Sequence, residues 1–424
     1  MKHLVLLVAA ALIAGACSPG PGTTASPGAD GASPTTIRFL LSGGPEELAA
    51  YTAIADEFAL VRPELEVEVS AVARQDDLLA RLTSGFAASS PPDVFLINFR
   101  KYGLYAAEEV LAPVQPFIDA SELINPDEFF QAPLAAFQFY GENQTCLPQN
   151  VSSLVTYVNR ELFEAAGVAL PTGDWDWDQF SATAKALTDE VTGVHGIGTD
   201  PALIRLAPMV WSAGGAVVDN QLAPTTLTLD TPEALEALDF FTSLVATGVA
   251  PDDLDEQARD SEARFIDGNL AMFWSSRKEV PGFREAIDDF TWDVVPFPLA
   301  PDGERVTMLH ADAFCLAAGT GREQSAWDFV EFALGPLGAT ILAESGRTVP
   351  SNKAVANSPA FLRTDAPPAN GQVFLDNAEI VRATPSTATW NEVENQADDI
   401  LKELFYGRIT KERALARLGQ LVFR

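Results

Sequence analysis

Cysteine and histidine are scarce in this chain of 424 residues. No two of the cysteines form a CxxC pair and the histidines form no cluster; the six residues are Cys17, Cys146, Cys315, His3, His195 and His310. Structural zinc sites hold the metal with four Cys or His ligands at short spacings. We therefore expect no structural zinc site and no other metal or cofactor.

Basic residues are also few. The chain has 27 Lys and Arg against 59 Asp and Glu, a formal net charge of −32 at pH 7. Binding to nucleic acid depends on Lys and Arg that neutralise phosphates, so this charge argues against a nucleic-acid partner. Self-repulsion on this scale favours a soluble monomer and disfavours anionic ligands at long range.

Long apolar runs are confined to the N-terminus. Residues 4–16 carry no charge and follow Lys2, but this run is shorter than the about 20 residues that a spanning helix needs. Small residues then lead into Cys17, which is typical of a bacterial lipoprotein signal cut before a lipid-bearing cysteine. An ordinary secretory signal cut nearby is the alternative, because Ala14 stands where such signals usually have Leu. Both interpretations export the protein.

Residues 18–35 consist of Ser, Pro, Gly, Thr and Ala with one Asp30, a composition with nothing to bury. We expect a flexible tether of roughly 20–25 Å between the anchor and a folded body. The body that follows is long enough for two lobes, each with a core of its own.

Strands and helices are predicted to alternate at the start of the body. Strands are expected at 36–41, 65–72 and 94–97, with amphipathic helices at 46–61 and 76–88. This β-α-β-α-β order predicts an α/β fold with a parallel sheet covered by helices. The second part has the same style, with strands expected at 153–159, 196–198, 270–273, 292–295 and 314–317, and helices at 160–166, 180–187, 208–213, from 231, 326–334 and 398–406.

Several sequence blocks, taken in order, resemble a known family. They are Val155 to Val168 with Pro171, Trp175 to Phe180, Trp211 to Gly215, Gly268 to Met272 with Trp274, and Gly407 to Leu415. Together they are similar to the family 1 extracellular solute-binding proteins, the group that contains maltose-binding protein. The resemblance covers most of residues 36–424.

The resemblance implies a two-lobed type II periplasmic-binding-protein fold in which the chain crosses between the lobes three times. We place the crossings near residues 146–149, 311–314 and 349–353. The N-terminal lobe would comprise 36–145 and 315–350, and the C-terminal lobe 146–314 and 351–424. Ligand would bind in the cleft between the lobes and be enclosed by hinge closure.

The predicted binding residues come first from loops that follow strands, where open sheets bind ligands. Gly43 and Gly44 could donate backbone N–H groups, or simply form a tight turn. Asn98 can both donate and accept hydrogen bonds, which suits sugar hydroxyls, and Arg100 beside it could bind two hydroxyls or lie on the surface.

Three indoles resemble aromatic residues that line the cleft in sugar-binding members of the family. Trp211, with Gly214 and Gly215 after it, Trp274 and Trp390 could each stack on the apolar face of a pyranose. The remaining candidates lie at the expected crossings, where they could bind ligand or order the hinge; they are Gln149, His310, Asp312 and Arg347. Four other tryptophans are expected to pack in the core, namely Trp175, Trp177, Trp292 and Trp327.

The resemblance also bears on the two remaining cysteines. Cys146 and Cys315 fall at crossing strands that run side by side in the family's architecture, which implies a disulfide between them; two buried free thiols are the alternative. The implied function is capture of a carbohydrate for the permease subunits of an ABC importer, without catalysis. An extracellular carbohydrate-active hydrolase, or a binding protein for a polyamine or glycerol phosphate, remains open, although no GxSxG or HExxH pattern is present.

Overall fold

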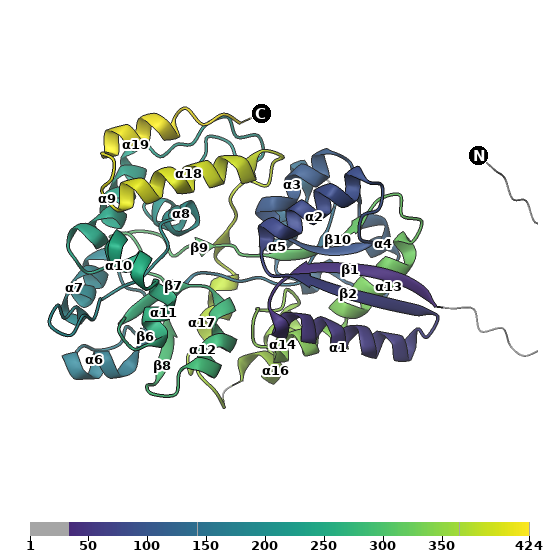
Figure 1. Cartoon of the computed structure of the whole chain (residues 1–424), viewed down its shortest axis with the longest axis horizontal. Coiled ribbons are helices and arrows are strands. Elements are labelled where there is room, and N and C mark those ends of the chain that lie inside the picture. The colour runs from purple at the N-terminus through teal and green to yellow at the C-terminus, as the bar shows by residue number, and fades with distance from the viewer. Residues whose placement is uncertain (1–33, 142, 364, 424) are drawn as a thin grey trace, which may run out of the picture. The chain divides into compact units, whose positions relative to one another are not determined.

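The computed structural model describes residues 34–141, 143–363 and 365–423 (Figure 1). The predicted signal, Cys17 and most of the predicted tether lie outside these residues. Thr35, expected to end the tether, is instead the first residue of strand β1.

The larger sheet has six strands in the order β2-β1-β3-β10-β4, with β5 paired to β10 as well. The strands are β1 (Thr35–Ser42), β2 (Leu65–Val72), β3 (Val94–Asn98), β4 (Leu111–Ala112), β5 (Leu147–Pro148) and β10 (Asp312–Ala317). The first three strands are parallel, as predicted, but β10 runs antiparallel to β3. The sheet is therefore mixed, because β10 enters it from the opposite direction.

Side-chain alternation along β1 places apolar residues on both faces of this sheet. Phe39 and Leu41 belong to a cluster with helices α1, α13 and α14, whereas Leu40 belongs to the cluster with α2 and α3. The helices of this lobe are α1 (Pro45–Val61), α2 (Gln75–Ala87), α3 (Phe99–Ala107), α4 (Gln115–Ala120), α5 (Gln131–Ala136), α13 (Glu323–Leu334) and α14 (Pro336–Glu344). Burial on both faces explains why β3 reads as a continuous apolar run.

The second lobe is built on a three-stranded sheet, β7-β6-β8, in which both pairings are antiparallel. Its strands are β6 (Val155–Asn159), β7 (Met272–Ser275) and β8 (Trp292–Val295), and a separate parallel pair joins β9 (Thr307–Met308) to β11 (Val381–Arg382). The strand expected at 196–198 is not formed; within it the structure has one isolated bridge, which joins Gly198 to Phe273.

Helices surround the second sheet (Figure 1). They are α6 (Arg160–Ala166), α7 (Trp177–Leu187), α8 (Leu203–Ser212), α9 (Pro232–Ala246), α10 (Asp253–Ala258), α11 (Ser261–Ile266), α12 (Val280–Ala286), α17 (Gln372–Ala378), α18 (Trp390–Phe405) and α19 (Lys411–Leu418). Thr231 caps α9 as predicted, accepting from Ala234 N. Helices α8 and α18 begin earlier than predicted, at Leu203 and Trp390.

The three segments expected to cross between the lobes lie side by side. Gln149 N donates to Asp312 O at 2.9 Å, and Ser351 N donates to Gln149 O at 3.1 Å. Ser152 and His310 exchange a pair of backbone hydrogen bonds at 2.7 and 2.8 Å. These bonds join all three segments into one hydrogen-bonded hinge.

The predicted lobe boundaries need small corrections at this hinge. Hydrogen bonds of the larger sheet include β5 and all of β10, so the boundary at 314/315 falls inside a strand and the one at 145/146 places β5 in the wrong lobe. Two short helices, α15 (Lys353–Ala356) and α16 (Pro359–Leu362), pack on α14 of the first lobe, although 351–424 was assigned to the second.

The predicted disulfide between Cys146 and Cys315 is present, with the two Cα atoms 4.6 Å apart. Pairing of Ala313 with Pro148 and of Phe314 with Leu147 continues in register to these two cysteines. The bridge therefore fastens the first crossing to the second. Among the described residues no single helix is long and apolar enough to cross a membrane, and the bent pair α13 and α14 could do so on length and composition alone.

Candidate functional site

A cavity of about 380 Å³ lies between the two lobes and against the hinge. We call it the polar cavity; its lining comprises Ser42, Gly43, Glu47, Ala73, Gln75, Leu96, Asn98, Arg100, Lys101, Gln149, Asn150, Ser152, Asp200, Ile204, Arg205, Ser276, Lys278, His310, Asp312, Arg347 and Thr348. Most of these residues follow the carboxyl ends of strands or lie on the crossings. The two lobes and the hinge thus each supply one wall.

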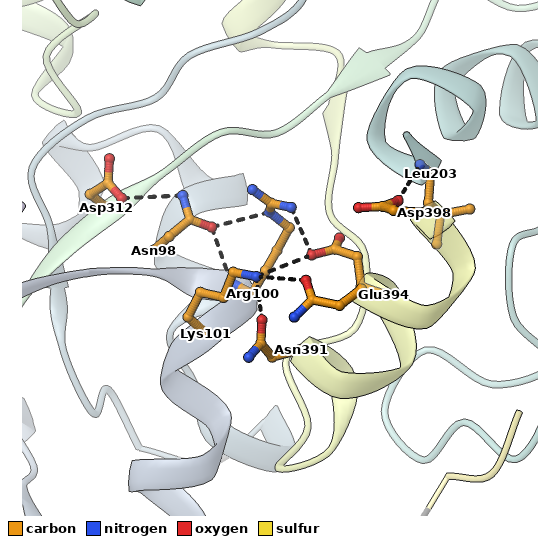
Figure 2. Close-up of polar contacts among 9 residues, drawn as sticks. Asn98, Arg100, Lys101, Leu203, Asp312, Asn391, Glu394 and Asp398 are labelled. Carbon is orange, nitrogen blue, oxygen red and sulfur yellow. Dashed lines mark hydrogen bonds and ion pairs between the residues drawn. The ribbon is translucent and has the colours of Figure 1, made fainter. Parts of the chain in front are cut away.

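Asn98 organises the first-lobe wall from the last position of β3. Its Oδ1 accepts from Arg100 N at 3.3 Å, capping α3, and from Arg100 Nε at 3.2 Å. Its Nδ2 donates to Asp312 Oδ1 at 3.1 Å, where β10 pairs with β3 (Figure 2). One amide therefore positions both an arginine and a carboxylate at the cavity.

Charged side chains at the N-terminal end of α3 link the two lobes (Figure 2). Arg100 Nη1 donates to Glu394 Oε2 of α18 at 2.7 Å, and Glu394 is only 1% exposed. Lys101 Nζ donates to Asn391 Oδ1 and lies 3.9 Å from Glu394 Oε2. This cross-lobe group forms one boundary of the polar cavity.

The hinge wall carries two groups whose ionisation is altered by burial. Burial raises the pKa of Asp312 above the usual range of an aspartate, opposed by its hydrogen bond from Asn98. Burial lowers the pKa of His310 well below its ordinary value, and nearby Arg100 and Arg205 act in the same direction. His310 is therefore a neutral imidazole at pH 7, able to donate from one nitrogen and accept at the other.

Every cation in the lining has an acidic neighbour. Besides the group at Glu394, the pairs are Arg347 Nε to Glu47 Oε2 at 3.0 Å, Arg205 Nε to Asp200 Oδ1 at 2.6 Å and Lys278 Nζ to Glu279 Oε1 at 3.2 Å. Burial raises the pKa of Glu47 to about 7, against the opposing effect of Arg347. Charge is thus balanced locally within the cavity, which does not call for a charged ligand.

Several buried polar atoms of the lining have no hydrogen-bond partner among the described residues. Apart from Glu47 Oε2, which forms the ion pair with Arg347, they are Gln75 Oε1, Gln149 Oε1, Ser152 Oγ, Arg205 Nη1 and His310 Nε2. Buried polar groups in native proteins are nearly always paired, because leaving one unpaired costs about 1–3 kcal/mol. Acceptors and donors both occur in this set, so their natural partner carries groups that do both, such as hydroxyls.

A second cavity of about 500 Å³ also takes its walls from both lobes. We call it the apolar cavity; its lining comprises Ala132, Ala135, Ala136, Gln138, Phe139, Trp211, Gly215, Ala216, Gln221, Leu222, Arg382, Ala383, Thr384, Ser386 and Thr387. Small side chains and two aromatic rings make up much of this lining, together with polar residues that include Gln138, Thr384 and Thr387. The two cavities have no lining residue in common.

The structure brings most of the predicted site residues together. Seven line the polar cavity, namely Gly43, Asn98, Arg100, Gln149, His310, Asp312 and Arg347. Trp211 and Gly215 line the apolar cavity instead. Gly44 serves as the N-cap of α1, and Gly214 adopts φ 85° in the turn after α8, where glycine is favoured.

Two predicted cleft indoles are placed elsewhere. Trp274 is fully buried among Phe180, Phe240 and Phe297, so core packing rather than ligand covers its ring. Trp390, fully buried at the start of α18, has its ring beside Phe423 and lines neither cavity. The four tryptophans expected in the core are buried as predicted.

Comparison with known proteins decides the family. The model of the bacterial extracellular solute-binding protein family matches residues 53–369. The chain belongs to this family. The match spans both lobes and all three crossings, and it includes the lining of the polar cavity of this solute-binding protein except for Ser42, Gly43 and Glu47.

Individual relatives are distant but cover most of the length. A putative binding protein of Brucella abortus is 24% identical over 340 residues, which is 78% of this chain and 79% of the relative. An uncharacterized lipoprotein of Streptomyces antibioticus is 26% identical over 379 residues, 84% of this chain and 78% of the relative. The structure is similar to that of a Listeria monocytogenes ABC substrate-binding protein in complex with cycloalternan, with a TM-score of 0.82 and 26% identity, covering 91% of this chain and 97% of the other.

Sequence reasoning missed several residues that line the polar cavity of this solute-binding protein. Gln75 follows β2 and Lys278 follows β7, so the rule that strand ends form ligand sites would have found both. Ser152 lies on the first crossing, next to predicted residues. Asp200 follows the strand predicted at 196–198, so the same rule would have found it, whereas Arg205 lies in α8, whose start was predicted at residue 208.

Proposed function

We propose that this solute-binding protein captures a neutral carbohydrate in the polar cavity and delivers it to the membrane subunits of an ABC importer. The observation that carries the proposal is the set of five buried, unpartnered donors and acceptors beside balanced charges. Sugar hydroxyls both donate and accept, so they can satisfy such a mixed set. The ligand named for the Listeria neighbour, cycloalternan, supports the same chemical class.

Charge pairing favours a sugar over the alternative solutes. A polyamine would need ionised acidic side chains left free, but Glu47 and Asp200 each bind an arginine in the lining, and burial raises the pKa of the third acid, Asp312. Glycerol phosphate would need free cations, and the lining's arginines and lysines have acidic neighbours. A neutral polyol leaves these pairs intact.

The test is a thermal-shift screen of the purified body against mono- and oligosaccharides, followed by titration calorimetry of the hits. Ligand that binds only the folded state raises the melting temperature. Gln149→Leu removes one unpartnered buried amide and should weaken binding of every hit by about 10- to 100-fold, corresponding to about 1–3 kcal/mol. Gln324→Leu, on the exposed face of α13, is the matched control. Absence of any saccharide hit, or release of reducing ends by the protein alone, contradicts the proposal.

Anchoring through lipid on Cys17 forms part of the same proposal. An anchor followed by a flexible tether would hold the body near the importer, and a Streptomyces relative is described as a lipoprotein. Cys17→Ala should abolish palmitate labelling and release the protein into the medium. Membrane association that persists unchanged in this variant excludes the lipid anchor.

A further inference from the structure

Arg277 is a buried cation that lies just after β7, directly behind the wall of the polar cavity. Its neighbours Ser276 and Lys278 line this cavity, whereas Arg277 does not line it and is only 1% exposed. Among the described residues no carboxylate forms an ion pair with its guanidinium. Burial lowers the pKa of Arg277 to about 10, which Tyr157 opposes and Arg284 reinforces, so the side chain is still charged at pH 7. Burying a charge without a counter-ion opposes folding, so stability alone does not account for this residue.

The guanidinium of Arg277 reaches from the second lobe to the start of the third crossing. Its Nε donates to Gly346 O at 3.0 Å, and its Nη2 donates to Phe361 O at 3.5 Å. Its Cζ lies 4.3 Å from the ring centroid of Phe361 and 4.9 Å from that of Phe374, an arrangement that attracts a cation. Phe361 lies on α16, which packs on α14 of the first lobe, whereas Phe374 lies on α17 of the second. One side chain therefore contacts both lobes at the hinge.

Gly346 directly precedes two residues that line the polar cavity, Arg347 and Thr348. It has φ 75° and donates its N–H to Ala343 O, which makes a tight turn at the end of α14. The carbonyl that accepts from Arg277 belongs to the planar peptide unit that joins Gly346 to Arg347. Holding this carbonyl fixes the orientation of the peptide from which Arg347 extends.

Arg347 carries the contact onward to the first-lobe wall of the cavity. Its Nε lies 3.0 Å from Glu47 Oε2 of α1, and this contact opposes the rise in the pKa of Glu47 that burial causes. A continuous set of contacts thus leads from Arg277 through Gly346 and Arg347 to Glu47. The ionisation of Glu47 consequently reports whether Arg347 is in place.

We propose that Arg277 is a positioning residue, which holds the peptide after Gly346 so that Arg347 lies in the wall of the polar cavity. It couples the second-lobe part of this wall to the third crossing, at a cost in stability. The consequence for solute affinity rests on the proposed function, whereas the consequence for Arg347 and Glu47 does not.

The placement of Arg347 can be tested without any solute. In protein labelled with 13C-glutamate, NMR spectra across pH follow the carboxyl of Glu47, assigned with Glu47→Gln. Arg277→Met has a side chain of similar length but no charge and no donor. Its Glu47 should titrate at a higher pH than in the parent, as it should in Arg347→Met, because Arg347 no longer opposes the effect of burial.

Two further variants separate positioning from general packing. Arg277→Lys preserves a cation and a donor, so its Glu47 should titrate closer to the parent than that of Arg277→Met. Arg264→Met is the matched control, because Arg264 is a largely buried arginine of the same lobe whose Nε and Nη2 donate to two backbone carbonyls within the α10–α11 segment. It should leave the titration of Glu47 unchanged.

Titration calorimetry then measures the consequence for binding, with the saccharides that stabilise the parent in the thermal-shift screen as probes. Arg277→Met should weaken their binding by about tenfold, equivalent to the loss of one hydrogen bond, and Arg264→Met should not. Arg277→Met combined with Arg347→Met should weaken binding little more than Arg347→Met alone, because both changes act through one side chain. The melting temperature of Arg277→Met should equal or exceed that of the parent, since an uncompensated charge is removed.

The outcomes distinguish the positioning role from the carbohydrate function. An unchanged Glu47 titration in Arg277→Met, or affinity losses that multiply in the double variant, overturns the positioning role and leaves the carbohydrate function intact. An Arg277→Met protein that does not fold, as judged by circular dichroism, assigns the residue to stability and also overturns it. A screen without a saccharide hit overturns the carbohydrate function, and the Glu47 titration then decides the positioning role by itself.

Discussion

The interactions that hold the two lobes together differ between the surroundings of the polar cavity and those of the apolar cavity. Around the polar cavity the lobes are tied by charge, through Arg100 and Glu394, and by the hydrogen bonds of the hinge. Around the apolar cavity they meet through close backbone contact, with Gly103 against Ser386. The strength of an ion pair depends on pH and on the presence of both charged side chains, whereas a close packing contact depends on the volume of the side chains that form it. Substitutions can therefore test each kind of tie separately.

Loss of Arg100 should produce the largest effect on the charged side. Arg100→Met leaves the buried carboxylate of Glu394 without its guanidinium, and breaking a buried pair in this way costs about 3–5 kcal/mol. Urea denaturation should show a decrease of this size in the free energy of unfolding. Arg100→Met combined with Glu394→Met should cost less, because the buried carboxylate is removed together with its guanidinium, although Lys101 loses its acidic neighbour.

A matched control for this pair is Arg74→Met, since Arg74 and Asp76 form an exposed ion pair on the surface. Exposed pairs contribute about 0–1 kcal/mol, so this variant should be nearly neutral. If Arg100→Met proves as mild as Arg74→Met, charge does not hold the lobes together at the polar cavity.

The next effect is a dependence of stability on pH that centres on Asp398 of α18. Burial raises the pKa of this residue to about 7; Glu394 on the same helix and Asp200 act in the same direction, and Arg100 and the N–H of Leu203 oppose it. The folded state therefore retains a proton that the unfolded state has lost. This contribution to stability is complete at acidic pH and is lost as the pH rises through about 7.

Asp398→Asn preserves an acceptor for Leu203 N, which donates at 2.6 Å, but removes the titration. The variant should match the parent near pH 4 and exceed it by about 2–4 kcal/mol above pH 7, measured as the free energy of unfolding across pH. Asp399→Asn, which changes the exposed residue next to Asp398, should have the same dependence of unfolding free energy on pH as the parent. A parental slope in Asp398→Asn would assign the pH dependence to other groups, among them Glu47.

The smallest of the three effects concerns the packed contact. Gly103→Ala places a methyl group 2.1 Å from Ser386 O, so the backbone of one lobe has to move. Overpacking of this kind costs about 1–3 kcal/mol and should weaken saccharide binding by opposing closure. Gly282→Ala in α12 is the matched control, since no atom lies within 4 Å of the added methyl; it should be neutral or stabilise by up to about 1 kcal/mol. Equal behaviour of the two variants would mean that the lobes do not close on this contact.

Sequence predicted the polar cavity better than the apolar one, and the reason is geometric. Asn98 ends β3 and Gly43 follows β1, in a sheet whose element order could be predicted, so their convergence at one edge could be expected. The apolar cavity is built from a short helix, a loop and the end of α8, and periodicity does not indicate how such segments meet.

Aromatic residues show most clearly what could not be predicted from the sequence. Trp211 and Trp274 both lie in family-like blocks, yet one borders a cavity and the other fills a core. An indole suits either environment, so the sequence around it does not distinguish them. The reversed direction of β10 was missed for a related reason: a strand that returns from another lobe carries no local mark of its orientation.

The disulfide between Cys146 and Cys315 makes the stability of this protein depend on the redox state of the compartment in which it folds. The cysteines are 169 residues apart in the sequence, and closing so long a loop restricts the unfolded chain by up to about 5 kcal/mol in the chain-entropy model. The cytoplasm keeps thiols reduced, so a chain awaiting export lacks this contribution. Urea denaturation with and without reductant measures it, and equal midpoints would show that it is negligible. Translocation machinery thus meets a chain that is easier to keep unfolded, and oxidation beyond the membrane then disfavours its return to that state.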